Sequence, residues 1–257
     1  MASIAGGIHL SILRAKDLGC NTLQIFSHNP RSWKNFSIPD EFVTKFKRLR
    51  KEHDINPVFI HTSYLINIAS PQSRIRDLSI RLLIREFEIA ELLEADYIIL
   101  HPGSSSTDES GGRKRAKEAL RMISSEGPWA VKLLLENTAS KRGDISSTVE
   151  DLADLIEGAQ GIAEGICLDT CHAFQSGYDI RSEKGIEILA KKLSSEIGLK
   201  AVKLIHLNDS KRVFHSGIDR HEHIGKGSIG MKGFRSFLNY HAFKDIPIIL
   251  ETPKRSD

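Results

Sequence analysis

The feature that most constrains the fold is a regular alternation, along all 257 residues, of short apolar runs with longer amphipathic ones. Continuously apolar strands that alternate with helices are typical of a parallel sheet whose outer side is covered by helices. We predict seven strands, at residues 21–27, 58–61, 97–101, 131–136, 166–169, 202–206 and 246–251. We predict helices at residues 40–53, 70–93, 108–125, 147–157, 182–197 and 231–240. Ser70 should cap the second helix, with Pro71 in its first position.

Length and composition predict one folded domain over residues 1–257, since about 250 residues is the usual size of a (β/α)₈ barrel. Hydrophobic residues make up 40% of the chain and charged residues 27%, which excludes a disordered protein. No apolar run approaches the roughly 18 residues that a membrane span needs. Residues 1–7 do not resemble the start of a signal peptide. The three cysteines form no disulfide pattern, so we expect a cytoplasmic protein.

Six of the predicted strands end in one side chain that can bind a metal ion. These are His61, His101, Glu136, Asp169, His206 and Glu251, separated by 40, 35, 33, 37 and 45 residues. Because parallel barrel strands all end on one face, the six groups should converge at one mouth. A single histidine after a strand is more often structural than a ligand. Six such ends together indicate a metal centre, because buried carboxylates need a counter-charge.

Further candidate ligands flank the same mouth. His172 follows the strand 166–169, and a glycine-rich loop at about 210–230 carries Asp219, His221 and His223. Imidazole and carboxylate without clustered thiolates favour zinc over manganese or iron, and we assign Cys171 a packing role. One zinc takes about four ligands, so this set suits two or three ions about 3.5–4 Å apart, an arrangement that supports phosphoester displacement.

The charge of this mouth differs from that of the whole chain. The formal net charge of +3 does not by itself predict a nucleic-acid partner. Glu136, Asp169, Asp219 and Glu251 bring four negative charges to the mouth, and three zinc ions would bring six positive ones. The loaded mouth would therefore carry a net charge of +2, which attracts phosphate.

Several longer motifs resemble those of the endonuclease IV family, the apurinic/apyrimidinic (AP) endonucleases of DNA base-excision repair. They are LHPGS (100–104), LLENTA (134–139), ICLDTCHAFQSGYDI (166–180), IHLNDSK (205–211) and IDRHEHIGKGSIG (218–230), and the similarity extends from Ile4 to Thr252. The resemblance implies a TIM barrel with three zinc ions, one of which manganese can replace. It also implies a hydrolase that cuts the phosphodiester 5′ to an abasic site and leaves a 3′-hydroxyl and a 5′-deoxyribose phosphate.

The resemblance further implies three sets of ligands. His61, His101 and Glu136 would hold the first zinc, and Glu136, as the catalytic bridging carboxylate, would also contact the second. The second set is completed by Asp169, His206 and Glu251, and the third consists of His172, Asp219 and His221. The match gives His223 no ligand role, and we expect it to support a ligand or the loop.

The resemblance also implies which side chains contact DNA. Arg31, Tyr64 and Leu65 match positions that probe the base stack at the abasic site, where a side chain can fill the gap. The alternative is that Leu65 and Trp33 only pack within their loops. Lys211, Arg212 and Lys226 are weaker candidates for phosphate contacts. We expect a monomer that acts on double-stranded DNA containing abasic sites.

The sequence departs from the family at its two ends. Only three residues precede Ile4, where the family has a barrel strand ending G-x-H-x-S, and the family continues past the last strand into a helix. We therefore expect the first strand and the last helix to be truncated. The edges of the strands 21–27 and 246–251 would then be unpaired.

Two other functions remain open at this point. A metal-dependent sugar isomerase or epimerase of the xylose-isomerase-like kind also gathers Glu, Asp and His at strand ends, but it uses one or two ions. The third set, with His172, Asp219 and His221, favours the nuclease. A non-catalytic DNA-binding barrel is the second alternative, and the presence of every expected ligand argues against it.

Overall fold

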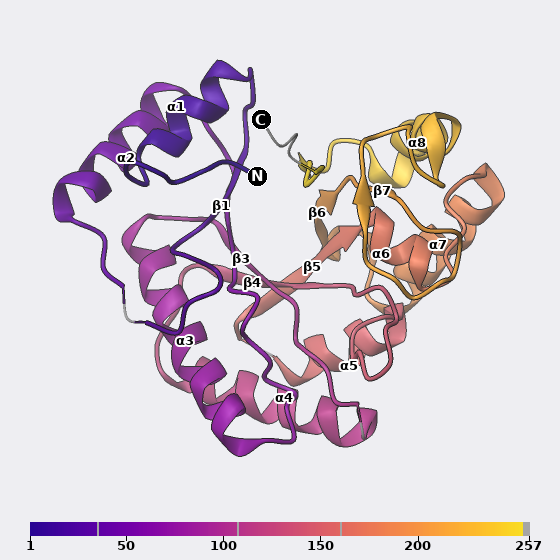
Figure 1. The fold of residues 1–257 in the computed structure, drawn as a ribbon, viewed down its shortest axis with the longest axis horizontal. Coiled ribbons are helices and arrows are strands. Elements are labelled where there is room, and N and C mark those ends of the chain that lie inside the picture. The colour runs from indigo at the N-terminus through magenta and orange to yellow at the C-terminus, as the bar shows by residue number, and fades with distance from the viewer. Residues whose placement is uncertain (35, 107, 160, 254–257) are drawn as a thin grey trace.

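The computed structural model describes residues 1–34, 36–106, 108–159 and 161–253, which form a nearly closed barrel of parallel strands inside a ring of helices (Figure 1). The strands pair in the order β1-β2-β3-β4-β5-β6-β9. Their bounds are Leu23–Phe26, Val58–His61, Tyr97–Leu100, Lys132–Glu136, Ala163–Asp169, Val202–His206 and Ile248–Ile249. The predicted α/β barrel and all seven predicted strands are confirmed, although β9 is much shorter than expected.

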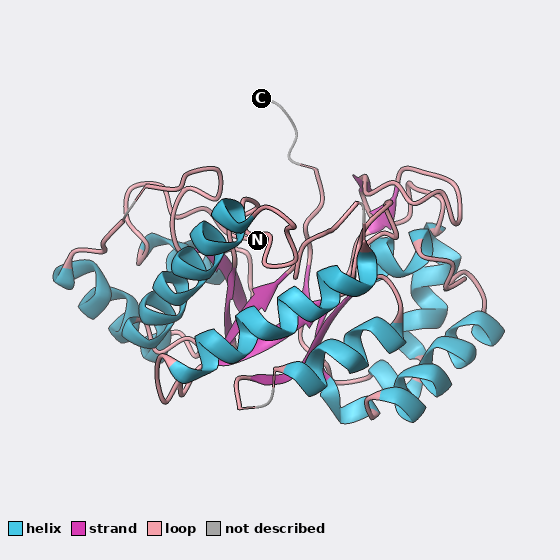
Figure 2. Cartoon of the chain, turned by 90° about the horizontal axis from the view of Figure 1, so that it is seen from below, coloured by secondary structure: helices cyan, strands magenta, loops and turns pink. Residues whose placement is uncertain are grey.

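The helices cover the outside of the strands, as the side view shows (Figure 2). They are α1 (Leu10–Asp17), α2 (Asp40–Glu52), α3 (Ser73–Leu92), α4 (Glu109–Ser125), α5 (Val149–Gly158), α6 (Thr170–Gln175), α7 (Glu183–Glu196) and α8 (Gly230–Asn239). In α3 the buried residues Ile80, Leu83, Phe87 and Ala90 recur every three or four positions, so one face packs on the sheet. No helix among the described residues is long and apolar enough to cross a membrane.

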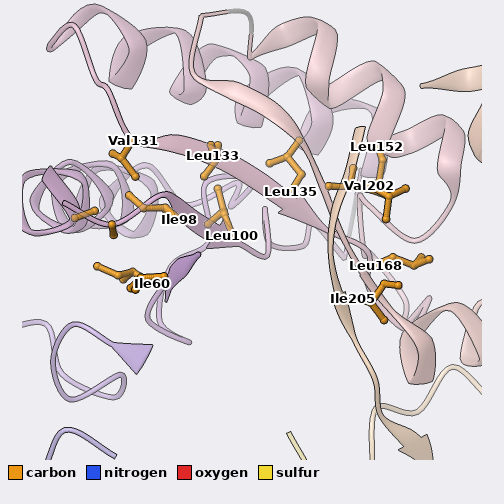
Figure 3. Close-up of a cluster of buried hydrophobic side chains, with 14 of the residues drawn as sticks. Ile60, Ile98, Leu100, Val131, Leu133, Leu135, Leu152, Leu168, Val202 and Ile205 are labelled. Atoms are coloured by element: carbon orange, nitrogen blue, oxygen red, sulfur yellow. The ribbon is translucent and has the colours of Figure 1, made fainter. Parts of the chain in front are cut away.

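The alternation of side chains along each strand separates two cores. Outward residues such as Ile60, Ile98 and Leu135 are fully buried against the helices (Figure 3). Inward residues fill the barrel itself: Phe59, Ile99, Leu134, Cys167, Leu204 and Ile249. Burial of each such large apolar side chain stabilises the fold by about 1.5–3 kcal/mol. The strand ends are thereby held in a fixed register around the barrel axis.

Three local features differ from the sequence predictions. The helix expected from Ser70 begins at Ser73, because the Ser70 hydroxyl accepts the N–H of Gln72 at 3.2 Å and closes a turn before the helix. Helices α1 and α6 were not predicted. The glycine-rich loop contains a short antiparallel pair, β7 (Asp209–Ser210) and β8 (His221–Glu222).

The barrel has a seam between β1 and β9, which form the two edges of the seven-stranded sheet. The described residues include no strand between these edges and no helix after β9. The departure of the sequence from the family pattern at its two ends led us to expect this. The first two residues lie between the edges instead. Ala2 N–H donates to the Gln24 carbonyl at 3.0 Å, and the Met1 amino group donates to the Leu250 carbonyl at 2.8 Å. Backbone hydrogen bonds thus cross the seam only through these two residues within the described chain.

Candidate metal centre

The alternation of side chains along each strand places the predicted ligands at the barrel mouth. His61, Glu136 and Asp169 each lie two positions after an inward residue of the barrel core. The same holds for His101, His206 and Glu251. Because side chains on a strand alternate between faces, all six point to the barrel axis at the C-terminal ends of the strands. The structure therefore brings together every strand-end residue singled out in the sequence.

Glu136 occupies the centre of this cluster and is 0% exposed. Its Oε2 lies 3.3 Å from Nε2 of both His61 and His101, and its Oε1 lies 2.9 Å from Nδ1 of His206. Oε2 has no hydrogen-bond partner. One oxygen of this carboxylate thus faces His61 and His101 and the other faces His206, which is the geometry of a ligand shared between two ions.

Two further groups of candidate ligands lie beside these residues at the barrel mouth. The metal-binding atoms of Glu136, Asp169, His206 and Glu251 all lie within 4.8 Å of one another, and so do those of Asp169, His172 and His221. Asp219 Oδ1 lies 3.3 Å from Nε2 of His172 and 3.4 Å from Nε2 of His221. All nine predicted ligands therefore belong to one continuous cluster.

Cys171 also lies close to Asp219 and His221. Burial raises the pKa of its thiol, which disfavours the thiolate that would bind a metal ion. Its Sγ lies 3.9 Å from the Arg220 carbonyl, consistent with a packing role. His223 belongs to none of the ligand groups found among the described residues.

The hydrogen bonds of the histidines set which ring nitrogen faces the cluster. Nδ1 lies 2.8 Å from the Thr62 carbonyl in His61, 2.9 Å from the Asn137 carbonyl in His172 and 3.2 Å from the Glu251 carbonyl in His221. A carbonyl only accepts, so Nδ1 carries the proton in each ring. Nε2 then faces the carboxylates. A metal-binding imidazole usually donates its other ring N–H to a carbonyl or carboxylate in this way.

The protonation equilibria of the cluster show how strongly it attracts positive charge. Burial opposes protonation of His172, but Asp169 and Asp219 outweigh it and raise the pKa of the imidazole to about 10. Burial would raise the pKa of Glu136, but His101 and His206 hold it well below its usual range. Burial lowers the pKa of His101 to about 4. Cations that bind here would displace protons from the imidazoles.

Three amide side chains that the sequence analysis did not single out hold the ligands. Asn208 Nδ2 donates to Asp169 Oδ2 at 2.6 Å, and Asn208 Oδ1 accepts the N–H of Glu251 at 2.8 Å. Asn137 Oδ1 accepts the N–H of Asp169 at 2.7 Å. Gln24 contacts both His206 and Glu251. The available signals were the position of Asn137 directly after a ligand, that of Asn208 two residues after one, and a polar Gln24 inside an apolar strand.

A buried carboxylate organises the glycine-rich loop that carries Asp219 and His221. The Asp209 oxygens accept the backbone N–H groups of Ser210, Gly225, Gly227, Ile229 and Gly230 at 2.8–3.3 Å. A Cβ at Gly227 would lie 2.3 Å from the Ser210 carbonyl oxygen. Glycine is therefore required for this close approach, as expected of a loop glycine.

The cluster opens into a cavity of about 1190 Å³ that continues into the seam. Its lining includes His61, His172 and His221 at the mouth, and Met1, Cys20 and Ile248 at the seam. Of the predicted DNA contacts, Arg31 and Tyr64 line the cavity and Leu65 does not, and Tyr64 is 60% exposed. A second cavity, of about 760 Å³, lies at the opposite ends of the strands and contains none of the predicted ligands.

The loops of Arg31 and Tyr64 are joined to each other. The Pro30 carbonyl accepts the Ser63 hydroxyl at 2.8 Å and the Tyr64 N–H at 3.2 Å. Behind this junction Glu86 of α3 is fully buried and accepts the Ser63 N–H at 2.9 Å. Burial raises the pKa of Glu86 to about 8, so this carboxyl group is chiefly neutral at pH 7.

Comparison with known proteins shows the family to which the chain belongs. Residues 12–257 match the family model described as xylose isomerase-like TIM barrel. The chain is 43% identical to the probable endonuclease 4 of Halothermothrix orenii over 99% of this chain and 92% of that protein. It is 41% identical to the protein of the same description from Thermotoga maritima, over 96% and 90%.

Among solved structures, endonuclease IV from Thermus thermophilus matches with a TM-score of 0.85 and 34% identity, over 98% of this chain and 90% of that one. A D-tagatose 3-epimerase-like protein matches with a TM-score of 0.71 but only 21% identity, which shows a shared fold and no more. Both relatives, from Halothermothrix orenii and Thermotoga maritima, match over nine-tenths or more of their length at more than 40% identity. The chain belongs to the endonuclease IV family within the xylose isomerase-like TIM barrels.

Proposed function

We propose that this protein is a zinc-dependent AP endonuclease consisting of a single catalytic domain. It would hydrolyse the phosphodiester 5′ to an abasic site in double-stranded DNA and leave a 3′-hydroxyl and a 5′-deoxyribose phosphate. The observation that carries the proposal is the position of Glu136, which has one oxygen facing His61 and His101 and the other facing His206. The free cysteines fit a cytoplasmic location, and we expect a monomer.

The residues present fit three metal ions. His61, His101 and Glu136 would hold the first, and Glu136, Asp169, His206 and Glu251 the second. His172, Asp219 and His221 would hold the third, and the unpartnered Nε2 of His221 points into this group. The donor set suits zinc, with manganese acceptable at one position. When bound, the ions supply a nucleophile at neutral pH and neutralise charge on the leaving oxygen.

The remaining groups act on the DNA. Tyr64 and Arg31 stand at the rim of the cavity on loops that are hydrogen-bonded to each other. An abasic site lacks a base, so a side chain can enter the stack there at low cost. We infer that Tyr64, Arg31 and Leu65 fill this gap and direct the neighbouring phosphodiester toward Glu136.

The test uses a duplex with one tetrahydrofuran abasic analogue, with and without prior removal of metal. The analogue does not undergo β-elimination, so a cut reports hydrolysis. We expect one metal-dependent cut 5′ to the analogue that leaves a 3′-hydroxyl, and three metal ions per chain. A folded protein with three ions that leaves the duplex intact would overturn the proposal. One or two ions per chain, with turnover of a ketose, would support the sugar epimerase instead.

A further inference from the structure

Gln24 joins the two sides of the seam beside the metal centre. It lies on β1, at an inward position between Leu23 and Ile25, and is 1% exposed. Its Nε2 donates to Glu251 Oε1 at 2.7 Å across the seam, and its Oε1 lies 2.6 Å from His206 Nε2. A buried amide with both ends engaged at such short distances is a specific arrangement, because any loss would leave buried polar atoms unsatisfied.

The chemistry of the amide group fixes the direction of both hydrogen bonds. A carboxylate only accepts, so the NH₂ end of Gln24 must face Glu251 and its oxygen must face His206. The oxygen in turn requires a proton on His206 Nε2. His206 therefore presents Nδ1 to the cluster, the reverse of His61, His172 and His221, which present Nε2.

His206 and Glu251 each keep one atom that does not bond to Gln24, and a metal ion would bind these two atoms. His206 Nδ1 lies 2.9 Å from Glu136 Oε1 and 3.4 Å from Glu251 Oε2. Oε2 of Glu251 is thus available on the cluster side because Oε1 is taken by Gln24. Gln24 thus determines which ring nitrogen of His206 and which oxygen of Glu251 face the cluster.

We infer that Gln24 is a positioning residue for the metal ion held by Glu136, Asp169, His206 and Glu251, and that it acts across the seam. The inference rests on the proposed function only for the identity of that ion. Glu251 follows the two-residue strand β9, which pairs with β6 alone, so its side chain depends on contacts such as this one. A side chain orienting two ligands typically affects metal affinity by 10–100-fold.

The first experiment is a zinc titration of the metal-stripped protein, competed against a chromophoric chelator. We expect Gln24→Met, which preserves side-chain length, to weaken one zinc ion by 10–100-fold and to leave the others within about threefold. The control is Thr22→Val, directly before β1, which removes the 2.6 Å hydrogen bond from Thr22 Oγ1 to the Pro57 carbonyl near the opposite ends of the strands from the predicted ligands. It should leave all zinc affinities unchanged.

On an abasic duplex, Gln24→Met should lower kcat by a similar factor with little change in KM. Zinc affinities equal to those of the wild type would overturn the inference. So would an equal weakening of all ions, or an equal effect of Thr22→Val, since either would indicate a general structural role. If the wild type binds zinc but does not cut the duplex, the proposed function fails while the titration still decides the role of Gln24.

A second measurement needs no variant and covers the case in which Gln24→Met does not fold. The ¹⁵N resonances of the imidazoles in the zinc-loaded wild-type protein report which ring nitrogen carries the proton. We expect a protonated Nε2 in His206 and a protonated Nδ1 in His61 and His172. A protonated Nδ1 in His206 would contradict the inference directly.

Discussion

The closed part of the barrel and the seam hold their candidate ligands by different means. His61, His101, Glu136 and Asp169 follow or end strands β2–β5, each of which is hydrogen-bonded to a neighbour on both sides. Glu251 follows β9, which is paired on one side only, and Asp219 and His221 lie on a loop. On the seam side, individual side chains such as Gln24, Asn208 and Asp209 take the place of the backbone ladder.

The two parts of the site therefore differ in how easily a single substitution can displace a ligand. Ligand position in the closed part is a property of strand register, which many hydrogen bonds and buried side chains determine together. Ligand position at the seam depends on a few contacts that a single substitution can remove.

The largest effect is expected at Glu136, in the closed part. Glu136→Gln should lower cleavage of the abasic duplex by 100-fold or more, because an amide lacks the charge needed to bind two cations. Strand register should keep the variant folded. Glu164→Gln is the control, since Glu164 lies on β5 at the far end of the barrel and pairs with Lys203 at 2.9 Å. Cleavage that survives Glu136→Gln would show that another carboxylate is shared between the ions.

Metal removal should separate the two regions. A ligand at a hundredfold excess over its Kd stabilises the fold by about 2.7 kcal/mol, so the loss of each ion should lower Tm by roughly 5–10 °C. Amide hydrogen exchange is the sharper measurement. We expect exchange after chelation to increase most in residues 218–223 and 248–251 and least in β3 and β4. Equal increases in all strands would show that the seam is no weaker than the closed part.

The sequence predicted the closed part better than the seam for a physical reason. Apolar runs that end in His, Asp or Glu report strand register, and register alone places His61, His101 and Glu136. The role of Gln24 depends on which strand lies across the seam, which no local pattern contains. Helix α6 begins because the Asp169 side chain accepts the His172 N–H at 2.7 Å, and the sequence pattern gave Asp169 only a ligand role. Two side-chain hydrogen bonds, one across the seam and one within residues 169–172, account for these two omissions.

A pH series on Glu86→Gln tests how the closed part tolerates a buried carboxyl group. Burial raises the pKa of Glu86 to about 8 in the folded protein, against 4.5 as the ordinary value. Between these values the unfolded chain binds fewer protons than the folded one, so the stability from this group falls as pH rises from about 4.5 to about 8. The amide has no such titration and keeps an oxygen for the Ser63 N–H.

Glu86→Gln should therefore gain stability over the wild type as pH rises, by of the order of 3 kcal/mol at pH 8. Equilibrium urea unfolding between pH 5 and pH 9 measures this gain. The control is Glu91→Gln on the same helix, where Glu91 accepts the Val131 N–H at 2.7 Å and is less buried. A constant difference between Glu86→Gln and the wild type across this range would exclude titration of Glu86 there.

The smallest effect is expected from a peptide segment added before Met1. Met1 and Ala2 already donate to Leu250 and Gln24 on the two edges. A segment preceding them would therefore lie in the seam between β1 and β9, parallel to both strands. About five residues with alternating Val and Thr should pair with both edges and raise the free energy of unfolding by about 1–2 kcal/mol, or about 2–8 °C in Tm.

The gain from such a segment is small because hydrogen bonds and buried area must offset the entropy of ordering it. A segment of equal length that contains two prolines is the control, since proline cannot donate to a ladder. If the seam also limits metal binding, the pairing segment should tighten the zinc ion at Glu251 and leave the ion at His61 and His101 unchanged. A rise in Tm without that change would mean that Gln24 alone, and not the open edge, sets how the seam holds its ligand.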